Sequence, residues 1–292
     1  NLVSGIAHAQ LLGSFRGFEN VLANENGGRI VGTEDANEIT LNDGTDDLVL
    51  AGGDDTIRAD GDTLNVGDLL SGGAGNDTLI IDGDSAFDLG AIQANANDID
   101  TLENVVLTGN DDDDVVLTMG ELFGARSGGL ESINIEGTGD HTVAVTTAAA
   151  MDLSDMTFTN VKTLDLAAGA TGVEITAGVF AGVEEVDVAT TTTINLDEGG
   201  TFDWSGITFT TVTTVAGGTG DADTIVFGDD VGSLTTIGTG TGTDAITFAG
   251  SDVVDISGLA ISAVENLEFG SASSVTMSND NGGGNMFESV TG

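Results

Sequence analysis

A nine-residue repeat constrains this chain more than any other feature. The repeats are GTEDANEIT at 32–40, LNDGTDDLV at 41–49, LAGGDDTIR at 50–58, TLNVGDLLS at 63–71 and GGAGNDTLI at 72–80. In each, the sixth residue is Asn or Asp and the eighth is aliphatic. A unit this short buries too little apolar surface to be stable alone, so it must stack on its neighbours. The period therefore predicts a solenoid.

The segment 72–80 matches the pattern G-G-x-G-x-D-x-U-x, where U is aliphatic, at every defined position. The glycines allow tight turns with positive φ and expose backbone carbonyls. The sixth-position carboxylate points into the turn beside those carbonyls, and calcium prefers such hard oxygen ligands. The predicted metal-binding residues of this array are Asp46, Asp55, Asp68, Asp77, the weaker ligand Asn37, and the turn glycines Gly44, Gly53, Gly73 and Gly75.

Residues 32–80 resemble the calcium-binding nonapeptide repeats of RTX proteins, which bacteria secrete. In composition and rhythm, most of the chain is similar to the RTX surface-layer proteins of Gram-negative bacteria. The resemblance implies a calcium-loaded β-solenoid, export by a type I system, calcium-dependent folding outside the cell, and self-assembly into a lattice or filament. It leaves a cell-surface polysaccharide open as a further partner. Unlike the family pattern, this array is short and interrupted, and no C-terminal secretion signal is identifiable.

A second phrase recurs beyond residue 100. Its copies are LENVVL at 102–107, LESINI at 130–135, VKTLDL at 161–166, VEEVDV at 183–188 and VENLEF at 264–269. Weaker copies begin at 212 and 234, so successive starts are 22–31 residues apart. Apolar and polar residues alternate within each phrase, which indicates a strand with one buried face. A strand that returns at this interval predicts one solenoid coil per phrase.

These signals predict an all-β fold, a right-handed parallel β-helix or β-roll solenoid with short helical caps or insertions. Residues 1–31 would form an N-terminal cap and the first coil, and residues 32–100 the nonapeptide β-roll. Residues 101–292 would form an irregular Thr/Gly/Asp-rich solenoid continuous with it. Apolar spacing predicts a capping helix over 2–15 and a short helix over 119–126.

Looser acidic turns lie between the later strands, at 109–117, 217–227 and 239–247. They add the candidate calcium ligands Asp112, Asp113, Asp114, Asp223 and Asp244. The alternative for all these acids is a solvated acidic surface, because a run of charges usually lies in water.

Composition excludes several classes of protein. The chain has 49 Asp and Glu, 5 Lys and Arg, and a formal net charge of −44, which opposes binding to nucleic-acid phosphates. It has no cysteine for disulfides or Cys-ligated zinc, and no apolar run long enough to insert into a membrane. No basic segment precedes an apolar core at the start, which agrees with type I export and equally with a fragment. The same charge opposes compaction, so calcium is expected to promote folding.

The sequence also argues against an enzyme. Neither His8 nor His141 lies in a nucleophile motif, and there is no G-x-S-x-G elbow. Parallel β-helices include polysaccharide lyases, but basic residues are few and Trp204 is the only tryptophan. Threonine-rich turns suggest an ice-binding protein as an alternative. No strict T-x-T spacing recurs from coil to coil, however, which argues against it.

We therefore expect a non-enzymatic, extracellular structural protein of the cell surface that binds calcium and assembles with copies of itself. Two alternatives stay open. One is a stalk or binding module of a type I-secreted RTX adhesin. The other is a calcium-binding appendage of a secreted enzyme.

Overall fold

The structure is a computed structural model of the 292-residue chain. It describes residues 6–8, 20–83, 87–89, 99–108, 116–119, 130–145, 151–166, 172–218, 220, 222–250, 253–271, 274–277 and 289–291. Backbone packing divides the chain into two compact units, residues 1–146 with 159–161, and residues 147–158 with 162–292. Every secondary-structure element that lies within the described residues is a β-strand. The strands pair in parallel, which confirms the predicted all-β solenoid.

The first unit contains three runs of parallel strands. The longest is β1 (Ile6–His8), β2 (Asn20–Leu22), β4 (Glu38–Thr40), β6 (Thr56–Asp60), β8 (Thr78–Asp82), β11 (Asn104–Thr108) and β13 (Ser132–Ile135). The second is β3 (Gly28–Val31), β5 (Asp46–Val49), β7 (Leu69–Ser71) and β10 (Ile99–Asp100). The third is β9 (Phe87–Asp88), β12 (Val116–Met119) and β14 (His141–Val145). Successive nonapeptides therefore alternate between two sheets, two per coil.

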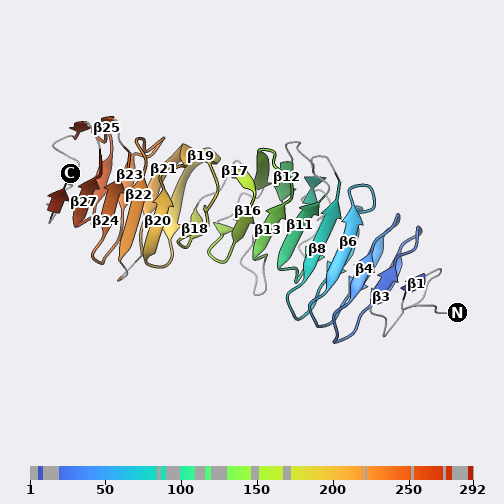
Figure 1. Cartoon of the computed structure of the whole chain (residues 1–292). Helices are drawn as coiled ribbons and strands as arrows, with labels where there is room; N and C mark the ends of the chain where they lie inside the picture. Colours follow the sequence, from blue (N-terminus) through green and yellow to red (C-terminus); the bar gives the residue numbers. More distant parts are fainter. Residues whose placement is uncertain are drawn as a thin grey trace. The chain divides into compact units, whose positions relative to one another are not determined.

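The eighth-position aliphatic residues form the core of this unit. Residues Ile39, Ile57 and Leu79 lie in register on β4, β6 and β8, which Figure 1 shows side by side. Leu48 and Leu70 are likewise paired in the opposite sheet, and all five side chains are at most 1% exposed. Each repeat thus supplies one fully buried side chain, and stacking lines these side chains into continuous apolar rows.

The second unit has the same construction. One run is β19 (Glu185–Leu196), β21 (Thr208–Ala216), β23 (Thr236–Gly238) and β26 (Ala260–Ser262), and β15 (Met151–Asp152) and β18 (Val173–Ile175) pair beside β19. Another is β20 (Gly200–Trp204), β22 (Asp223–Phe227), β24 (Ala245–Phe248), β27 (Asn266–Phe269) and β29 (Ser289–Thr291). A pair is formed by β25 (Val253–Asp255) and β28 (Ser274–Thr276). Finally, β16 (Thr157–Thr159) and β17 (Val161–Leu166) lie where the division between the units falls in the sequence.

An aromatic row fills the core of the second unit. Trp204, Phe227, Phe248 and Phe269 occupy registered positions on four adjacent strands. Successive ring centroids are 5.8, 5.6 and 5.3 Å apart. Such spacing allows favourable ring–ring contact in addition to burial. Because Trp204 is the only tryptophan and is 3% exposed, its fluorescence reports on the folding of this unit.

The second repeated phrase begins after a left-handed backbone corner. The residues directly before four of its copies have positive φ although they are not glycine: Thr101 (52°), Asn160 (58°), Thr211 (68°) and Ala263 (57°). Glycine fills the same place at Gly182 (φ 84°). Left-handed φ is uncommon for residues with a Cβ, so its recurrence at one position identifies a structural corner. After the corner, the first, fourth and sixth residues are buried, as for Leu102, Val105 and Leu107.

The structure corrects the prediction of a capping helix over 2–15. Residues Ile6–His8 form strand β1, which pairs in parallel with β2. These residues therefore add one more strand to the sheet and do not form a helix over its end. The apolar spacing misled because short strands and helices can bury similar residues. The remainder of 2–15 lies outside the described residues, as does 120–126, while Met119 ends strand β12. The predicted segment boundaries at residues 31 and 100 stay predictions.

The left-handed corner gives a stability test. The substitution Ala263→Gly should raise the free energy of unfolding by roughly 0.5–1 kcal/mol, because relief of left-handed strain outweighs the added freedom of the unfolded chain. Ala245→Gly in strand β24 should lower it by roughly 0.5–1 kcal/mol. Urea unfolding followed by Trp204 fluorescence measures both. A destabilised Ala263→Gly protein would contradict the assignment of strain to this corner.

Candidate cation site: the buried carboxylate ladders

Acidic side chains are stacked from coil to coil in the first unit. Asp55 Oδ1 accepts a hydrogen bond from the backbone N–H of Asn37 at 2.6 Å. In the same way Asp77 Oδ1 accepts the N–H of Asp55 at 2.8 Å, and Glu103 Oε2 accepts the N–H of Asp77 at 2.7 Å. Each carboxylate therefore accepts a hydrogen bond from the main chain of the preceding coil. We call Asn37, Asp55, Asp77 and Glu103 the first ladder.

Two further ladders have the same bond. In the second ladder, formed by Asp46 and Asp68, Asp68 Oδ1 accepts the Asp46 N–H at 2.7 Å. The third ladder lies in the second unit and consists of Asp223, Asp244 and Glu265. Its N–H to carboxylate distances are 2.9 Å for Asp223 to Asp244, and 2.8 Å for Asp244 to Glu265.

The predicted ligands are thus sorted into separate stacks. The five sixth-position residues alternate between the first and second ladders because successive nonapeptides alternate between sheets. Asp223 and Asp244 form the third. Asp112, Asp113 and Asp114 lie outside the described residues. Sequence reasoning missed Glu103 and Glu265, although both are the second residue of the LEN or VEN phrase.

The ladder carboxylates are buried but incompletely hydrogen-bonded. Asp55, Asp77 and Asp244 are at most 1% exposed, and the Oδ2 atom of each has no hydrogen-bond partner. Neither carboxylate oxygen of Asp46 makes a hydrogen bond of ordinary geometry. A buried ionised carboxylate with an unpaired oxygen carries a large desolvation penalty. A nearby cation would compensate the charge of these groups.

Glycine brings backbone carbonyls next to these carboxylates. A Cβ on Gly72 would overlap both Asp77 Oδ2 and the carbonyl oxygen of Thr101. A Cβ on Gly217 would overlap the carbonyl of Thr239 and lie against Asp223 Oδ2. Only glycine leaves room for the two kinds of oxygen to approach the same point.

The four predicted turn glycines have a related role. Gly44, Gly53, Gly73 and Gly75 have φ values of 112°, 97°, 111° and 149°. A Cβ on any of them would overlap the backbone of a neighbouring coil. These glycines therefore permit both the left-handed turns and the close packing of one turn on the next.

The donor chemistry fits calcium, with carbonyl oxygens contributing much of the ligand set. Carboxylate and carbonyl oxygens are the ligands that calcium prefers. Among the described residues, no group of three or more His, Cys, Asp or Glu side chains is placed to hold a metal ion. A bound ion would therefore need backbone carbonyls, such as that of Thr101, beside one or two ladder carboxylates.

Burial raises the pKa of the acids in the first and second ladders. It raises the pKa of Asp46 to about 7, with a further contribution from the negative charge of Asp68, while the facing N–H of Gly28 opposes the shift. It raises the pKa of Asp55 to about 6, although the hydrogen bond from Asn37 N–H opposes part of the change. The pKa values of Asp68, Asp77 and Glu103 are raised for the same leading reason. Protons and cations therefore compete for these groups near neutral pH.

The described basic side chains are engaged at the surface. Arg29 pairs with Asp47 at 2.9 Å, and Arg58 with Glu38 at 2.7 Å, each across adjacent strands. Lys162 pairs with Glu184 in the same way. All three pairs are solvent-exposed, so their contribution to stability is modest.

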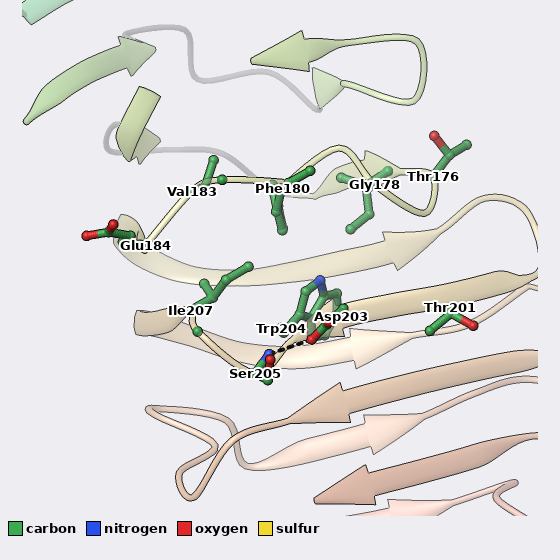
Figure 2. A pocket seen from close by; sticks show the side chains of 14 residues that line it. Thr176, Gly178, Phe180, Val183, Glu184, Thr201, Asp203, Trp204, Ser205 and Ile207 are labelled. Atoms are coloured by element: carbon green, nitrogen blue, oxygen red, sulfur yellow. Dashed lines mark hydrogen bonds between the residues drawn. The ribbon is translucent and has the colours of Figure 1, made fainter. Parts of the chain in front are cut away.

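A pocket of about 400 Å³ lies in the second unit between the turn at 176–183 and the turn at 204–207 (Figure 2). Phe180 and Trp204 line it together with glycine and aliphatic residues. Asp203, also in the lining, accepts the backbone N–H of Ser205 at 3.1 Å, and its bonds to Ser205 lower its pKa. The lining contains none of the predicted metal ligands.

Comparison with known protein families, curated proteins and solved structures finds no match to this chain. In the part of the chain that the structure describes, no helix has the length and apolar character needed to cross a membrane. The chemistry of the ladders is therefore the basis for assigning a function.

The raised pKa values predict how pH acts on the calcium-free protein. A folded-state pKa above the unfolded value means that the native state binds more protons, so stability is highest below about pH 4 and is lost as pH rises through 6–7. Asp46→Asn should raise the free energy of unfolding at pH 8 by about 1–3 kcal/mol, since each pKa unit corresponds to about 1.4 kcal/mol, and change it little at pH 4.

Far-UV circular dichroism of the protein in chelator measures this effect, through urea unfolding at pH 4 and through the folded fraction at pH 8. Asp62→Asn is the control, because it removes one negative charge from an exposed side chain. Equal effects of the two substitutions at both pH values would show that general charge repulsion, and not burial of Asp46, controls the pH response.

Proposed function

We propose that this protein is an extracellular, calcium-stabilised β-solenoid that assembles with copies of itself into a surface layer or filament. The observation that carries the proposal is the juxtaposition of Asp77 Oδ2, which is buried and has no hydrogen-bond partner, with the carbonyl of Thr101 across Gly72. Such an oxygen pair suits a hard cation better than it suits empty apolar space.

The residues proposed to hold calcium are the ladder aspartates with nearby carbonyls. They are Asp46, Asp55, Asp68 and Asp77 in the first unit, and Asp223 and Asp244 in the second. Calcium would supply positive charge that compensates buried carboxylates between adjacent coils. Because these carboxylates come together only in the folded chain, binding would favour the folded state.

An extracellular location would supply the calcium that compensates the net negative charge of the chain. Extracellular calcium modules typically bind in the range of about 10⁻⁴–10⁻³ M, where calcium is abundant. A chain of net charge −44 would fold poorly without a compensating cation. The RTX resemblance of residues 72–80 supports type I export to the cell surface by analogy.

One face of the second unit is suited to contact between copies. Outward positions on β19, β21, β23 and β26 form two registered rows without a charged side chain. The rows are Thr193, Thr214, Thr236 and Ala260, and Asn195, Ala216, Gly238 and Ser262. On so acidic a molecule, contact between copies at this face would meet little local charge repulsion.

Calcium titration tests the folding part of the proposal. The chelated wild-type protein should gain β-sheet signal cooperatively as calcium is added. Asp77→Asn should raise the calcium midpoint at least threefold, because it removes a ligand charge, while the exposed control Asp62→Asn should leave it nearly unchanged. A β-sheet spectrum that is complete in chelator and unmoved by calcium would overturn the calcium assignment.

Sedimentation in excess calcium tests the assembly part. Thr214→Asp combined with Thr236→Asp should convert assembled wild-type protein to monomer by placing charge on the uncharged face, without changing the calcium midpoint for folding. Thr201→Asp, which adds charge to the exposed part of β20, is the control. A wild-type protein that stays monomeric in calcium would favour the stalk or appendage alternatives.

A further inference from the structure

The first ladder ends in a distinctive arrangement around Glu103. The backbone of Asp77 donates its N–H to Glu103 Oε2 at 2.7 Å. Its carbonyl accepts two hydrogen bonds in return, from the N–H of Glu103 at 3.1 Å and from the N–H of Asn104 at 3.0 Å. The left-handed residue Thr101 lies two positions before Glu103. We call this set of three bonds after a left-handed residue the Glu clasp.

The same clasp recurs at the end of the third ladder. Asp244 donates its N–H to Glu265 Oε2 at 2.8 Å. Its carbonyl accepts the N–H of Glu265 at 3.1 Å and that of Asn266 at 3.0 Å. The left-handed residue here is Ala263. Two copies that agree within 0.1 Å in each bond, from distant parts of the sequence, indicate one module used twice.

The clasp ends a ladder for a physical reason. At an aspartate rung the backbone N–H donates forward to the carboxylate of the next coil, as Asp55 does to Asp77. At Glu103 the corner at Thr101 turns the N–H back toward the Asp77 carbonyl, so this N–H is no longer available to a following carboxylate. The same holds for Glu265 and the Asp244 carbonyl. The extra methylene of glutamate lets its carboxylate still reach back across the corner.

The clasp also binds a second carboxylate to the backbone of a residue whose own carboxylate has an oxygen without a partner. Asp77 Oδ2 and Asp244 Oδ2 are buried and make no hydrogen bond. Glu103 is 7% exposed, and its carboxylate is held on the backbone N–H of Asp77 at 2.7 Å. Two buried acids joined through one backbone offer oxygen ligands of the kind that calcium prefers.

We propose that Glu103 and Glu265 are the terminal ligands of two separate cation-binding arrays, one in each unit, each closed by its Glu clasp. The last ion of the first array would lie between Asp77 and Glu103, and that of the second between Asp244 and Glu265. This inference rests on the proposed calcium function and adds ligands that the nonapeptide pattern does not contain.

Glutamine substitutions in the full chain test the proposal. Gln has an amide oxygen that still accepts the Asp77 or Asp244 N–H, so Glu103→Gln and Glu265→Gln keep the clasp while removing the charge. Glu131→Gln is the matched control, because Glu131 is the second residue of the LESINI phrase and is exposed. Amide hydrogen exchange of peptides covering β4–β8 and β22–β27, measured at increasing calcium, reads each array separately, and calorimetry counts the bound ions.

Glu103→Gln should raise the calcium midpoint for protection of β4–β8 at least threefold, remove one bound ion, and leave β22–β27 unchanged. Glu265→Gln should do the reverse, and Glu131→Gln should do neither. If Asp77→Asn and Asp244→Asn shift the midpoints but the Gln variants do not, the terminal ligands are wrong and the calcium function stands. If none of these variants shifts a midpoint, the calcium function falls as well. A Gln variant that shifts both arrays equally would overturn their separation.

Discussion

The structure depends on one hydrogen bond, from the backbone N–H of one coil to the buried carboxylate of the next. It joins successive coils where the turns lead into the paired strands, as in the bonds from Asp55 to Asp77 and from Asp46 to Asp68. The same bond obliges a charged group to lie inside the solenoid. The second oxygen of Asp55, Asp77 and Asp244 is buried without a protein hydrogen-bond partner, which carries a desolvation penalty for the charged form.

This penalty links stability to the surroundings of the protein. The raised pKa values of Asp46 and Asp55 mean that these acids are neutral at low pH and charged at higher pH, where a cation would compensate their charge. Asn37, the first residue of this ladder, is neutral, and its side-chain oxygen accepts the N–H of Thr33 in its own turn at 2.8 Å. The next two residues of this ladder, Asp55 and Asp77, are aspartates. An amide oxygen could accept the same N–H without a charge, so aspartate at these positions is consistent with the proposed cation binding.

The two kinds of repeat have complementary tasks. The nonapeptides build coils whose turns carry the ladder acids, and the LEN or VEN phrases turn the backbone through a left-handed corner and end a ladder. Between ladders, the core is held by ordinary apolar packing. In the second unit this packing includes the row from Trp204 to Phe269. On the proposed function, the fold therefore combines regions that would respond to cations with regions that would not.

The sequence by itself determined the parallel β-solenoid, because its nine-residue period and single aliphatic position per repeat allow few other ways to bury a core. It also identified Asp46, Asp55, Asp68 and Asp77 as residues with a common environment. Only the tertiary structure decided how they are grouped, since alternation between two sheets places Asp55 with Asp77 and Asp46 with Asp68. Likewise, Glu103 and Glu131 occupy the same place in similar phrases, yet Glu103 is buried on Asp77 and Glu131 is exposed. That difference arises from the preceding coil, which offers a free N–H to Glu103 alone.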